Sequence, residues 1–323
     1  MTSAPVPLAL CGVGRFATRR ILPALAQCPD LRPTAVISAS RSTAEINGVL
    51  VPVFPSIEAY VASEPTGAIY VLTPNHLHAG QSIAAMNAQL HVLCEKPMAV
   101  TVSECDAMLA AARRTARVLQ IAHVLRHSPA MALAKQWIAD GRIGQVHTAH
   151  ASIDFDLPPA ARPWAQDPSI AGGGVLMDVG IHCIDLFHWW FRGPLVATVA
   201  SFVRPDESAL ETSVHAKFTA GGIACTVDVQ ASRPYRSHLE LQGADGSITV
   251  PSFSASWGTL DVVWRGNGGA TETVTVDADH NYLHQLQAFA TSLNQAPDYE
   301  AAEDAAAAVS LVQTFYDRDR VNP

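Results

Sequence analysis

Two stretches of the sequence carry residues that could move a proton. Glu95-Lys96-Pro97 closes the apolar run Gln89–Cys94, which predicts a buried strand. Pro97 cannot continue a strand and restricts the backbone of Lys96, so the lysine is expected at a defined place at the strand's end. A lysine held there can act as a proton donor or acceptor. The alternative is an ordinary ion pair at a strand end.

The second stretch holds Asp178 and His182. If this segment is helical, the two residues lie four apart on one face, with Asp185 near that face. His182 could then donate a proton to a hydroxyl or carbonyl oxygen, and Asp178 could accept a hydroxyl or orient its neighbours. Helix N-capping for Asp178 and a satisfied core histidine for His182 are the alternatives.

A glycine-rich turn indicates a phosphate-binding site near the N-terminus. Gly12-Val13-Gly14-Arg15-Phe16-Ala17 lies between the predicted strand Val6–Cys11 and the predicted helix Ala17–Gln27. The first glycine allows a tight turn, the second lets a pyrophosphate approach, and the small third residue lets the helix pack closely. The pattern predicts a dinucleotide site that includes Gly12, Gly14, Arg15 and Phe16. A plain strand–helix turn is the alternative.

The end of the second predicted strand, Thr34–Ala39, favours one dinucleotide over another. No carboxylate lies between Leu31 and Ala44, whereas a ribose with a free 2′-hydroxyl usually meets an Asp or Glu there. Ser38, Ser40 and Arg41 instead suit a 2′-phosphate. We therefore expect NADP to be preferred, with NAD as the alternative cofactor if Arg41 is only a solvated loop cation.

The predicted elements that position these residues form two domains. Strands and helices alternate through residues 1–122, which predicts a doubly wound parallel sheet. Residues 123–323 begin with the helix Ser128–Asp140 and the long strand Gln145–Phe155. Seven further strand-like runs follow without intervening helices and predict a large, open, mostly antiparallel sheet: Val196–Val203, Ser213–Thr219, Gly222–Gln230, Ser237–Gln242, Gly246–Pro251, Thr259–Trp264 and Thr271–Val276.

Two connecting regions complete this α/β architecture. The loop Pro158–Gly174 contains Arg162, Trp164 and three consecutive glycines, which leaves room for a ligand. Tyr282–Leu293 and Ala301–Tyr316 are predicted closing helices, and the last one is expected to pack back on the body of the protein.

Composition excludes several classes of function. The 323 residues carry a formal net charge of −8 with no basic block, so nucleic acid and anionic membranes are not expected partners. The six cysteines are scattered without C-x-x-C spacing and predict reduced thiols in a cytoplasmic protein. We expect no signal peptide and no membrane span. His76 and His78 lack further ligands at metal spacing, so no metal is expected.

Taken together, the motifs resemble one family. They are Gly12-x-Gly14-x-x-Ala17, Thr73-Pro74-Asn75-x-x-His78, Glu95-Lys96-Pro97, Gly141-Arg142-Ile143-Gly144, Gly172-Gly173-Gly174 and Asp178-x-x-x-His182. Their order is similar to that in the glucose–fructose oxidoreductase / inositol dehydrogenase (Gfo/Idh/MocA) family. The resemblance implies a Rossmann domain, a second domain whose open sheet often mediates dimers or tetramers, and NAD(P)-dependent oxidation or reduction of sugars or polyols.

The resemblance also implies roles for particular residues. Lys96 matches the family's lysine at the nicotinamide, Asp178 and His182 match its Asp/His pair, and Ser38 stands where NAD-using members carry Asp. The cofactor site is expected to include Thr73, Pro74, Asn75, His78 and Glu95. The substrate site is expected to include Lys96, Asp178, His182 and, by a looser similarity, Arg162, Trp164 and Tyr282.

The expected function is thus hydride transfer between NADP and a carbonyl or secondary alcohol of a sugar-like substrate. Lys96 and His182 would transfer the proton and Asp178 would orient, all converging on one reacting carbon. One alternative is a dinucleotide-binding sensor or partner module without turnover. Another is redox-neutral glycoside cleavage through a transient ketone, with a permanently held cofactor.

Overall fold

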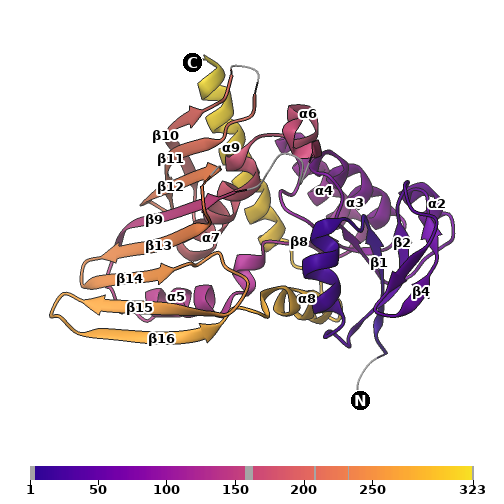
Figure 1. Ribbon diagram of the computed structural model, residues 1–323, viewed down its shortest axis with the longest axis horizontal. Coiled ribbons are helices and arrows are strands. Elements are labelled where there is room, and N and C mark those ends of the chain that lie inside the picture. The colour runs from indigo at the N-terminus through magenta and orange to yellow at the C-terminus, as the bar shows by residue number, and fades with distance from the viewer. Residues whose placement is uncertain (1–3, 157–162, 207–208, 232, 322–323) are drawn as a thin grey trace. The chain divides into compact units, whose positions relative to one another are not determined.

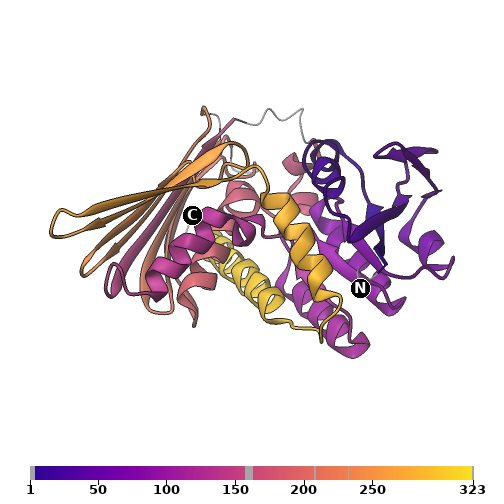
Figure 2. The ribbon, with the colours of Figure 1, turned by 90° about the horizontal axis from the view of Figure 1, so that it is seen from below.

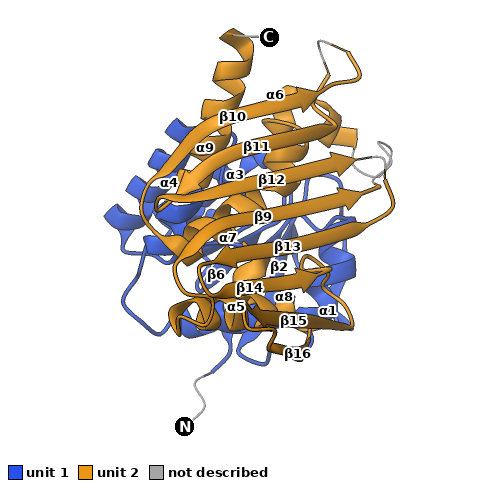
Figure 3. Cartoon of the chain, turned by 90° about the vertical axis from the view of Figure 1, so that its left-hand side faces the viewer, with its two compact units in different colours: residues 1–122, 282–306 blue, residues 123–281, 307–323 orange. Residues whose placement is uncertain are grey.

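The computed structural model describes residues 4–156, 163–206, 209–231 and 233–321 (Figure 1). The chain divides into two compact units, residues 1–122 with 282–306 and residues 123–281 with 307–323 (Figure 3). The sequence-based division also separated the chain after residue 122, but it placed residues 282–306 with the second domain. The substrate-binding and oligomerisation roles given to that domain remain predictions.

The first unit is built around a parallel sheet. Its elements are β1 (Val6–Cys11), η1 (Ala17–Ile21), α1 (Leu22–Leu25), β2 (Leu31–Ile37), β3 (Ala44–Ile46), β4 (Val49–Val51), β5 (Val53–Phe54), α2 (Ile57–Val61), β6 (Ala68–Val71), η2 (Asn75–Leu77), α3 (His78–Asn87), β7 (His91–Cys94), α4 (Val102–Thr115), β8 (Leu119–Ile121) and α8 (Asn281–Ser292). The six-stranded sheet has the order β5-β2-β1-β6-β7-β8, and each neighbouring pair is parallel. This confirms the predicted doubly wound sheet.

The register of this sheet brings distant turns to one edge. Cys11 pairs with Ile37 on one side and with Val71 on the other, and Val71 pairs with Cys94. These residues end β1, β2, β6 and β7, so the segments that follow all leave the sheet at its carboxyl edge. Ligands bind at this edge in open α/β sheets. The four turns that follow these strands therefore share one edge of the sheet.

Side chains cap the start of α4. Thr101 is the N-cap: its hydroxyl accepts the Glu104 N–H, and the Glu104 carboxylate accepts the Thr101 N–H. This reciprocal pair satisfies two N–H groups that the helix leaves unpaired. The helix start also supports the turn around Lys96, because only four residues separate Pro97 from Val102.

The second unit combines one large sheet with helices on one of its faces. Its elements are η3 (Val124–His127), α5 (Pro129–Ala139), β9 (Val146–Phe155), η5 (Pro163–Gln166), α6 (Pro168–Ala171), η6 (Leu176–Gly180), α7 (Ile181–Phe191), β10 (Leu195–Val203), β11 (Ser213–Ala220), β12 (Ile223–Ala231), β13 (Arg236–Gly243), β14 (Gly246–Pro251), β15 (Thr259–Gly266), β16 (Thr271–Asp277) and α9 (Glu300–Val321), whose first turns belong to the first unit. The strand order is β10-β11-β12-β9-β13-β14-β15-β16, with β12–β9 as its parallel pair.

The faces of this sheet differ. In β11, the buried residues Val214, Ala216, Phe218 and Ala220 alternate with more exposed ones, as expected when one face packs on a core. Helices α5 and α7 cover the buried face (Figure 2). In the part of the chain that the structure describes, no helix covers the other face (Figure 3). The predicted open, mostly antiparallel sheet is confirmed.

All six cysteines are free and buried, as expected for structural thiols. Among the described residues, the helical stretch Pro168–Phe191 has the length and composition of a membrane span, but 67% of its apolar window is buried inside the protein. Core helices of globular proteins have the same property, so this stretch is weak evidence for a membrane span.

Candidate active site

The glycine-rich turn has the geometry needed to receive a pyrophosphate. Gly12 has φ +89°, and a Cβ there would approach the Leu72 carbonyl oxygen to 3.0 Å, so the tight turn requires glycine. A Cβ at Gly14 would meet no atom within 4 Å. Helical backbone starts at Arg15, which leaves N–H groups directed toward this open space. The turn therefore fits a dinucleotide phosphate.

The end of β2 places a cation beside that turn. The Arg41 side chain is exposed, and its Nη2 donates to the Val13 carbonyl oxygen at 2.9 Å. The Ser38 and Ser40 hydroxyl oxygens lie 3.4 Å apart, and the Ser40 N–H is directed at the Ser38 hydroxyl. Hydroxyls and a guanidinium thus lie beside the turn, in the part of the fold that meets the ribose.

His78 joins two of the turns at the sheet edge. Its ring is fully buried, with Nδ1 2.8 Å from the Pro97 carbonyl oxygen and Nε2 2.9 Å from the Thr73 carbonyl oxygen. Burial lowers the pKa of His78, although its contacts with the two carbonyls act in the opposite direction. This geometry supports a role in holding the turns together. Direct contact of His78, Pro74 or Asn75 with a cofactor remains a prediction.

The Glu95-Lys96-Pro97 turn follows β7, and the Lys96–Pro97 peptide is cis. Lys96 is half-buried. Glu95 Oε1 accepts the Tyr70 hydroxyl at 2.7 Å, and Oε2 accepts the Lys96 backbone N–H at 3.3 Å. Burial raises the pKa of the Glu95 carboxyl to about 7, against the lowering effects of the Tyr70 hydroxyl and the Lys96 charge.

Tyr282 also belongs to the first unit. It lies in α8, and its ring meets the Phe16 ring edge-on, with centroids 5.8 Å apart. The structure thus brings the aromatic side chain predicted for the substrate site against the glycine-rich turn. Its contact with substrate remains a prediction.

In the second unit, the helical segment with Asp178 and His182 is not regular. Leu176–Gly180 forms a π-helical turn, and α7 follows directly. The simple four-residue spacing of an α-helix therefore does not apply between Asp178 and His182. The N-cap position belongs to Val175, not to Asp178. Such π-turns are frequent at functional sites.

The buried carboxylate of Glu211 holds the start of this turn. It accepts the N–H groups of Gly174 and Leu176, each at 3.1 Å, and the hydroxyl of Tyr316 at 2.6 Å. A Cβ at Gly174 would clash with Glu211. The glycine run therefore permits close packing against Glu211 and Tyr316, which fixes the backbone that leads to Asp178.

His182 packs against His123, which lies next to a buried ion pair. The rings of His123 and His182 meet at 90° with centroids 6.0 Å apart, and His123 Nδ1 lies 3.6 Å from Asp185 Oδ2. Arg126 donates to both oxygens of Asp185, at 2.7 and 2.8 Å. Asp185 is 1% exposed, so this bidentate ion pair is almost completely shielded from water.

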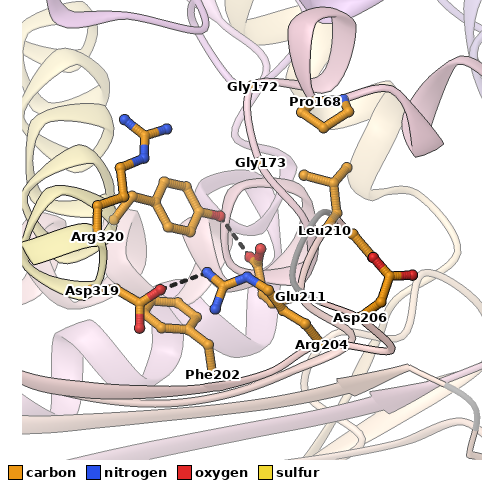
Figure 4. Close-up of a pocket in the computed structure, with 12 residues that line it drawn as sticks. Pro168, Gly172, Gly173, Phe202, Arg204, Asp206, Leu210, Glu211, Asp319 and Arg320 are labelled. Carbon is orange, nitrogen blue, oxygen red and sulfur yellow. Dashed lines mark hydrogen bonds and ion pairs between the residues drawn. The ribbon is translucent and has the colours of Figure 1, made fainter. Parts of the chain in front are cut away.

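The second unit also contains a cavity of about 740 Å³. Figure 4 shows the ion pair of Arg204 with Asp319 and the Tyr316–Glu211 hydrogen bond in its wall. Its lining residues, all within the described chain, include neither Asp178 nor His182. We therefore do not assign this cavity to the reacting substrate.

The structure brings some of the predicted residues together within each unit. The glycine turn, Ser38, Arg41, Thr73 and Lys96 share the sheet edge of the first unit, whereas Asp178 and His182 belong to the second. Convergence of the lysine and the Asp/His pair on one carbon remains a prediction. Trp164 lies half-buried in η5, and Arg162 lies outside the described residues.

Sequence reasoning missed the residues that support these side chains. Gln285 and Tyr70 form the hydrogen-bonded chain that reaches Glu95. The His123 ring packs on His182, and Arg126 pairs with Asp185 next to them. Glu211 accepts backbone N–H groups at the glycine run. Tyr70 had a usable signal, because a tyrosine hydroxyl in a fully buried strand needs a partner. The other supporting residues gave no such signal in the sequence, since their partners are 35 to 215 residues away.

Comparison with known proteins supports this architecture. A family model described as an oxidoreductase family with an NAD-binding Rossmann fold matches residues 6–123, and its C-terminal domain model matches residues 131–249. The chain is 33% identical over 242 residues to 1,5-anhydro-D-fructose reductase of Ensifer adhaerens, covering 74% of this chain and 72% of the relative. It is 26% identical to D-xylose 1-dehydrogenase [NADP(+)] of Haloarcula marismortui, over 88% of this chain and 82% of that protein.

Crystal structures of other proteins share this fold. A 3-ketoreductase from Actinomadura kijaniata, crystallised with NADP and TDP-benzene, matches with a TM-score of 0.86 at 23% identity over 97% of both chains. Aldose-aldose oxidoreductase from Caulobacter crescentus matches with a TM-score of 0.88 at 23% identity, over 99% of this chain and 98% of that one. The two matched domain models and the 33% identical relative confirm the resemblance found in the motifs. This chain belongs to the Gfo/Idh/MocA family of NAD(P)-dependent oxidoreductases.

Proposed function

We propose that this protein transfers hydride between NADP, which it prefers to NAD, and a carbonyl or secondary alcohol of a sugar or polyol. The observation that carries the proposal is the row of strand ends in the first unit. It aligns the glycine-rich turn, the Arg41 guanidinium and the Lys96 turn at a single sheet edge. A cation beside the ribose region and a lysine farther along the same edge suit the two ends of one NADP molecule.

The relatives support the class of substrate. One is named a 1,5-anhydro-D-fructose reductase and another a D-xylose 1-dehydrogenase that uses NADP(+). Both names describe redox chemistry at a carbon of a small carbohydrate. We infer the same class of substrate here, without choosing a particular sugar or the direction of the reaction.

In this proposal, NADP supplies the hydride acceptor or donor, and the protein supplies placement and proton transfer. Gly12, Gly14 and the helix start hold the pyrophosphate, while Ser38 and Arg41 bind the 2′-phosphate. The Lys96 amine and the His182 imidazole exchange a proton with the substrate oxygen. Asp178 orients the substrate hydroxyl and His182. Fixed placement of these groups lowers the entropic cost of reaching the reactive arrangement.

The cofactor preference is tested by paired titration of the purified protein with NADPH and NADH, followed by fluorescence. We expect tighter NADPH binding, and Arg41→Ala should weaken NADPH binding by about tenfold or more while leaving NADH nearly unchanged. Arg32→Ala, an exposed arginine at the opposite end of β2, is the matched control. NADH binding as tight as NADPH binding in the wild type would refute the preference.

Turnover is tested against a panel of sugars and polyols with the preferred cofactor, by following NADPH absorbance. Lys96→Met and His182→Asn should each lower kcat by about a hundredfold or more, because each removes a positioned proton donor. Lys217→Met, an exposed lysine on β11, should leave kcat unchanged. Full turnover in a folded Lys96→Met variant would rule out the proposed chemistry.

A further inference from the structure

Three residues, one from α8, one from β6 and one from the turn after β7, form a hydrogen-bonded chain that ends beside Lys96. Gln285 of α8 donates from Nε2 to the Tyr70 hydroxyl oxygen at 3.1 Å. Tyr70 of β6 donates to Glu95 Oε1 at 2.7 Å. Tyr70 and Gln285 are both 0% exposed, and all three residues belong to the first unit. Neither Tyr70 nor Gln285 has a part in the function proposed above.

The direction of the hydrogen bonds in this chain is determined by chemistry. Burial, reinforced by the Glu95 charge, keeps the pKa of the Tyr70 phenol well above its usual value, so Tyr70 remains a neutral hydroxyl at any working pH. Its oxygen accepts the Gln285 amide, and its single proton is therefore directed to Glu95. The other Glu95 oxygen accepts the Lys96 backbone N–H at 3.3 Å.

Ionisation of Glu95 changes which hydrogen bonds this chain can form. The carboxylate form offers acceptor positions to both the phenol and the Lys96 amide. A protonated carboxyl carries a hydrogen on one oxygen and gives up part of that capacity. The charge also matters, because the Lys96 charge favours the ionised form of Glu95. Ionisation of Glu95 can therefore control the shape of the turn that carries Lys96.

We propose that the Gln285–Tyr70–Glu95 chain is a positioning device for Lys96, in which ionised Glu95 holds the turn that carries the lysine in its working conformation. The inference rests on the proposed role of Lys96 in proton transfer. Tyr70 and Gln285 are positioning residues in this scheme, since neither touches the reacting atoms.

The titratable groups around Glu95 leave few competitors for its effect. Tyr70 stays neutral, and burial raises the pKa of the neighbouring Cys94 thiol and that of Cys11 so that both stay protonated. Burial lowers the pKa of His78, which interacts with Lys96. Tyr282 of α8 acts on Tyr70, and Cys105 of α4 acts on Cys94. His76 also acts electrostatically on His78. Burial raises the pKa of the Glu95 carboxyl to about 7, so its charge changes near neutral pH.

The first test compares pH profiles of kcat and kcat/KM for the wild type and Tyr70→Phe. Loss of the hydroxyl removes a hydrogen bond that favours ionised Glu95, so the acid limb should move up by about half a pH unit to one unit. Activity near pH 6 should then fall about three- to tenfold, with much less change above pH 8. Gln285→Met should move the limb in the same direction by less.

Tyr60→Phe is the matched control, because Tyr60 is also buried in the first unit but lies in α2, outside this chain. It should leave the acid limb in place. Glu95→Gln should abolish the limb. If the acid limb stays unchanged in both Tyr70→Phe and Glu95→Gln, a group other than Glu95 causes the loss of activity at low pH, and the inference is wrong.

A second measurement does not depend on turnover. The rate of Lys96 modification by an amine reagent, followed by peptide mass spectrometry at fixed pH without cofactor, reports on how the turn presents the amine. Glu95→Gln should change this rate by about threefold, because the carboxylate that accepts the Lys96 backbone N–H is gone, whereas Tyr60→Phe should not change it. Unchanged labelling in Glu95→Gln would refute the coupling. If Glu95→Gln changes the rate of Lys96 labelling but Lys96→Met keeps full turnover, the proposed function is wrong, whereas the link between Glu95 and Lys96 is confirmed.

Discussion

Each unit of this protein holds a carboxylate near a residue that we assign to proton transfer, and the two carboxylates, buried Asp185 and half-buried Glu95, are stabilised in different ways. Asp185, in the second unit, forms a bidentate ion pair with Arg126 and faces His123, whose ring packs on His182. Glu95, in the first unit, receives its hydrogen bonds from a phenol and a backbone amide. One carboxylate has a countercharge in hydrogen-bond contact, and the other has neutral donors.

This difference predicts a structural role for Asp185 and a pH-dependent role for Glu95. A guanidinium at hydrogen-bond distance compensates the cost of burying Asp185, so removal of the arginine leaves an unpaired charge. Neutral donors compensate Glu95 only in part, and burial raises the pKa of its carboxyl to about 7. We therefore expect the Asp185 network to determine mainly stability and the Glu95 network to determine mainly pH dependence.

The largest expected effect is on the second unit. Arg126→Met should lower the free energy of unfolding by about 3–5 kcal/mol, because Asp185 would be left buried without its partner. Urea denaturation followed by circular dichroism measures this loss. Arg204→Met is the control, since its ion pair with Asp319 is partly exposed and should contribute about 1 kcal/mol or less. Equal losses in the two variants would contradict the comparison.

A double variant sharpens the same prediction. In Arg126→Met/Asp185→Leu the unpaired charge is gone, and much of the lost stability should return. A double variant as unstable as Arg126→Met alone would mean that packing of the arginine stem, and not the buried charge, explains the loss.

The next effect is the pH dependence that Glu95 adds to stability. The pKa of its carboxyl rises from its ordinary value of 4.5 to about 7 in the folded state, so the folded protein binds the proton more tightly than the unfolded chain does. The penalty for ionised Glu95 is absent below about pH 4.5 and complete above about pH 7. The free energy of unfolding should therefore fall through this window as the pH rises, by at most about 3 kcal/mol.

The difference between wild type and Glu95→Gln isolates this contribution from other titrating groups. Unfolding free energies measured at about pH 5 and pH 8 should show a larger fall in the wild type than in the variant. Parallel pH dependence in the two proteins would show that Glu95 ionises in the folded state much as it does in the unfolded chain.

The smallest expected effect is the stability cost of Tyr70→Phe. One buried hydroxyl is lost, and its hydrogen bond contributes about 1 kcal/mol. Thermal unfolding monitored by calorimetry should show a modest decrease in Tm. A loss comparable to that of Arg126→Met would mean that the Tyr70 chain is also a main structural support, and the contrast between the units would disappear.

Local patterns were enough to predict the elements and the turns. Alternation of apolar runs with amphipathic stretches indicated the parallel sheet, and the positions of Gly12, Gly14 and Lys96 at strand ends followed from it. Errors arose where the deciding contact was distant. The four-residue spacing considered for Asp178 and His182 holds only in a regular helix, but Leu176–Gly180 forms a π-helical turn whose start is held by Glu211 and Tyr316 from other parts of the chain.

The glycine-rich turn and the lysine at strand ends, and the Asp/His pair in its apolar helical segment, can be read from the sequence because each pattern depends on neighbours a few positions away. The partners of those residues cannot. Tyr70, Glu95 and Gln285 meet because β6 and β7 pair and α8 returns to the first unit after a separation of 215 residues. The periodicity of the sequence does not show that α8 packs against β6, so only the tertiary structure decides that Asp185 pairs with a guanidinium and that Glu95 accepts a phenol.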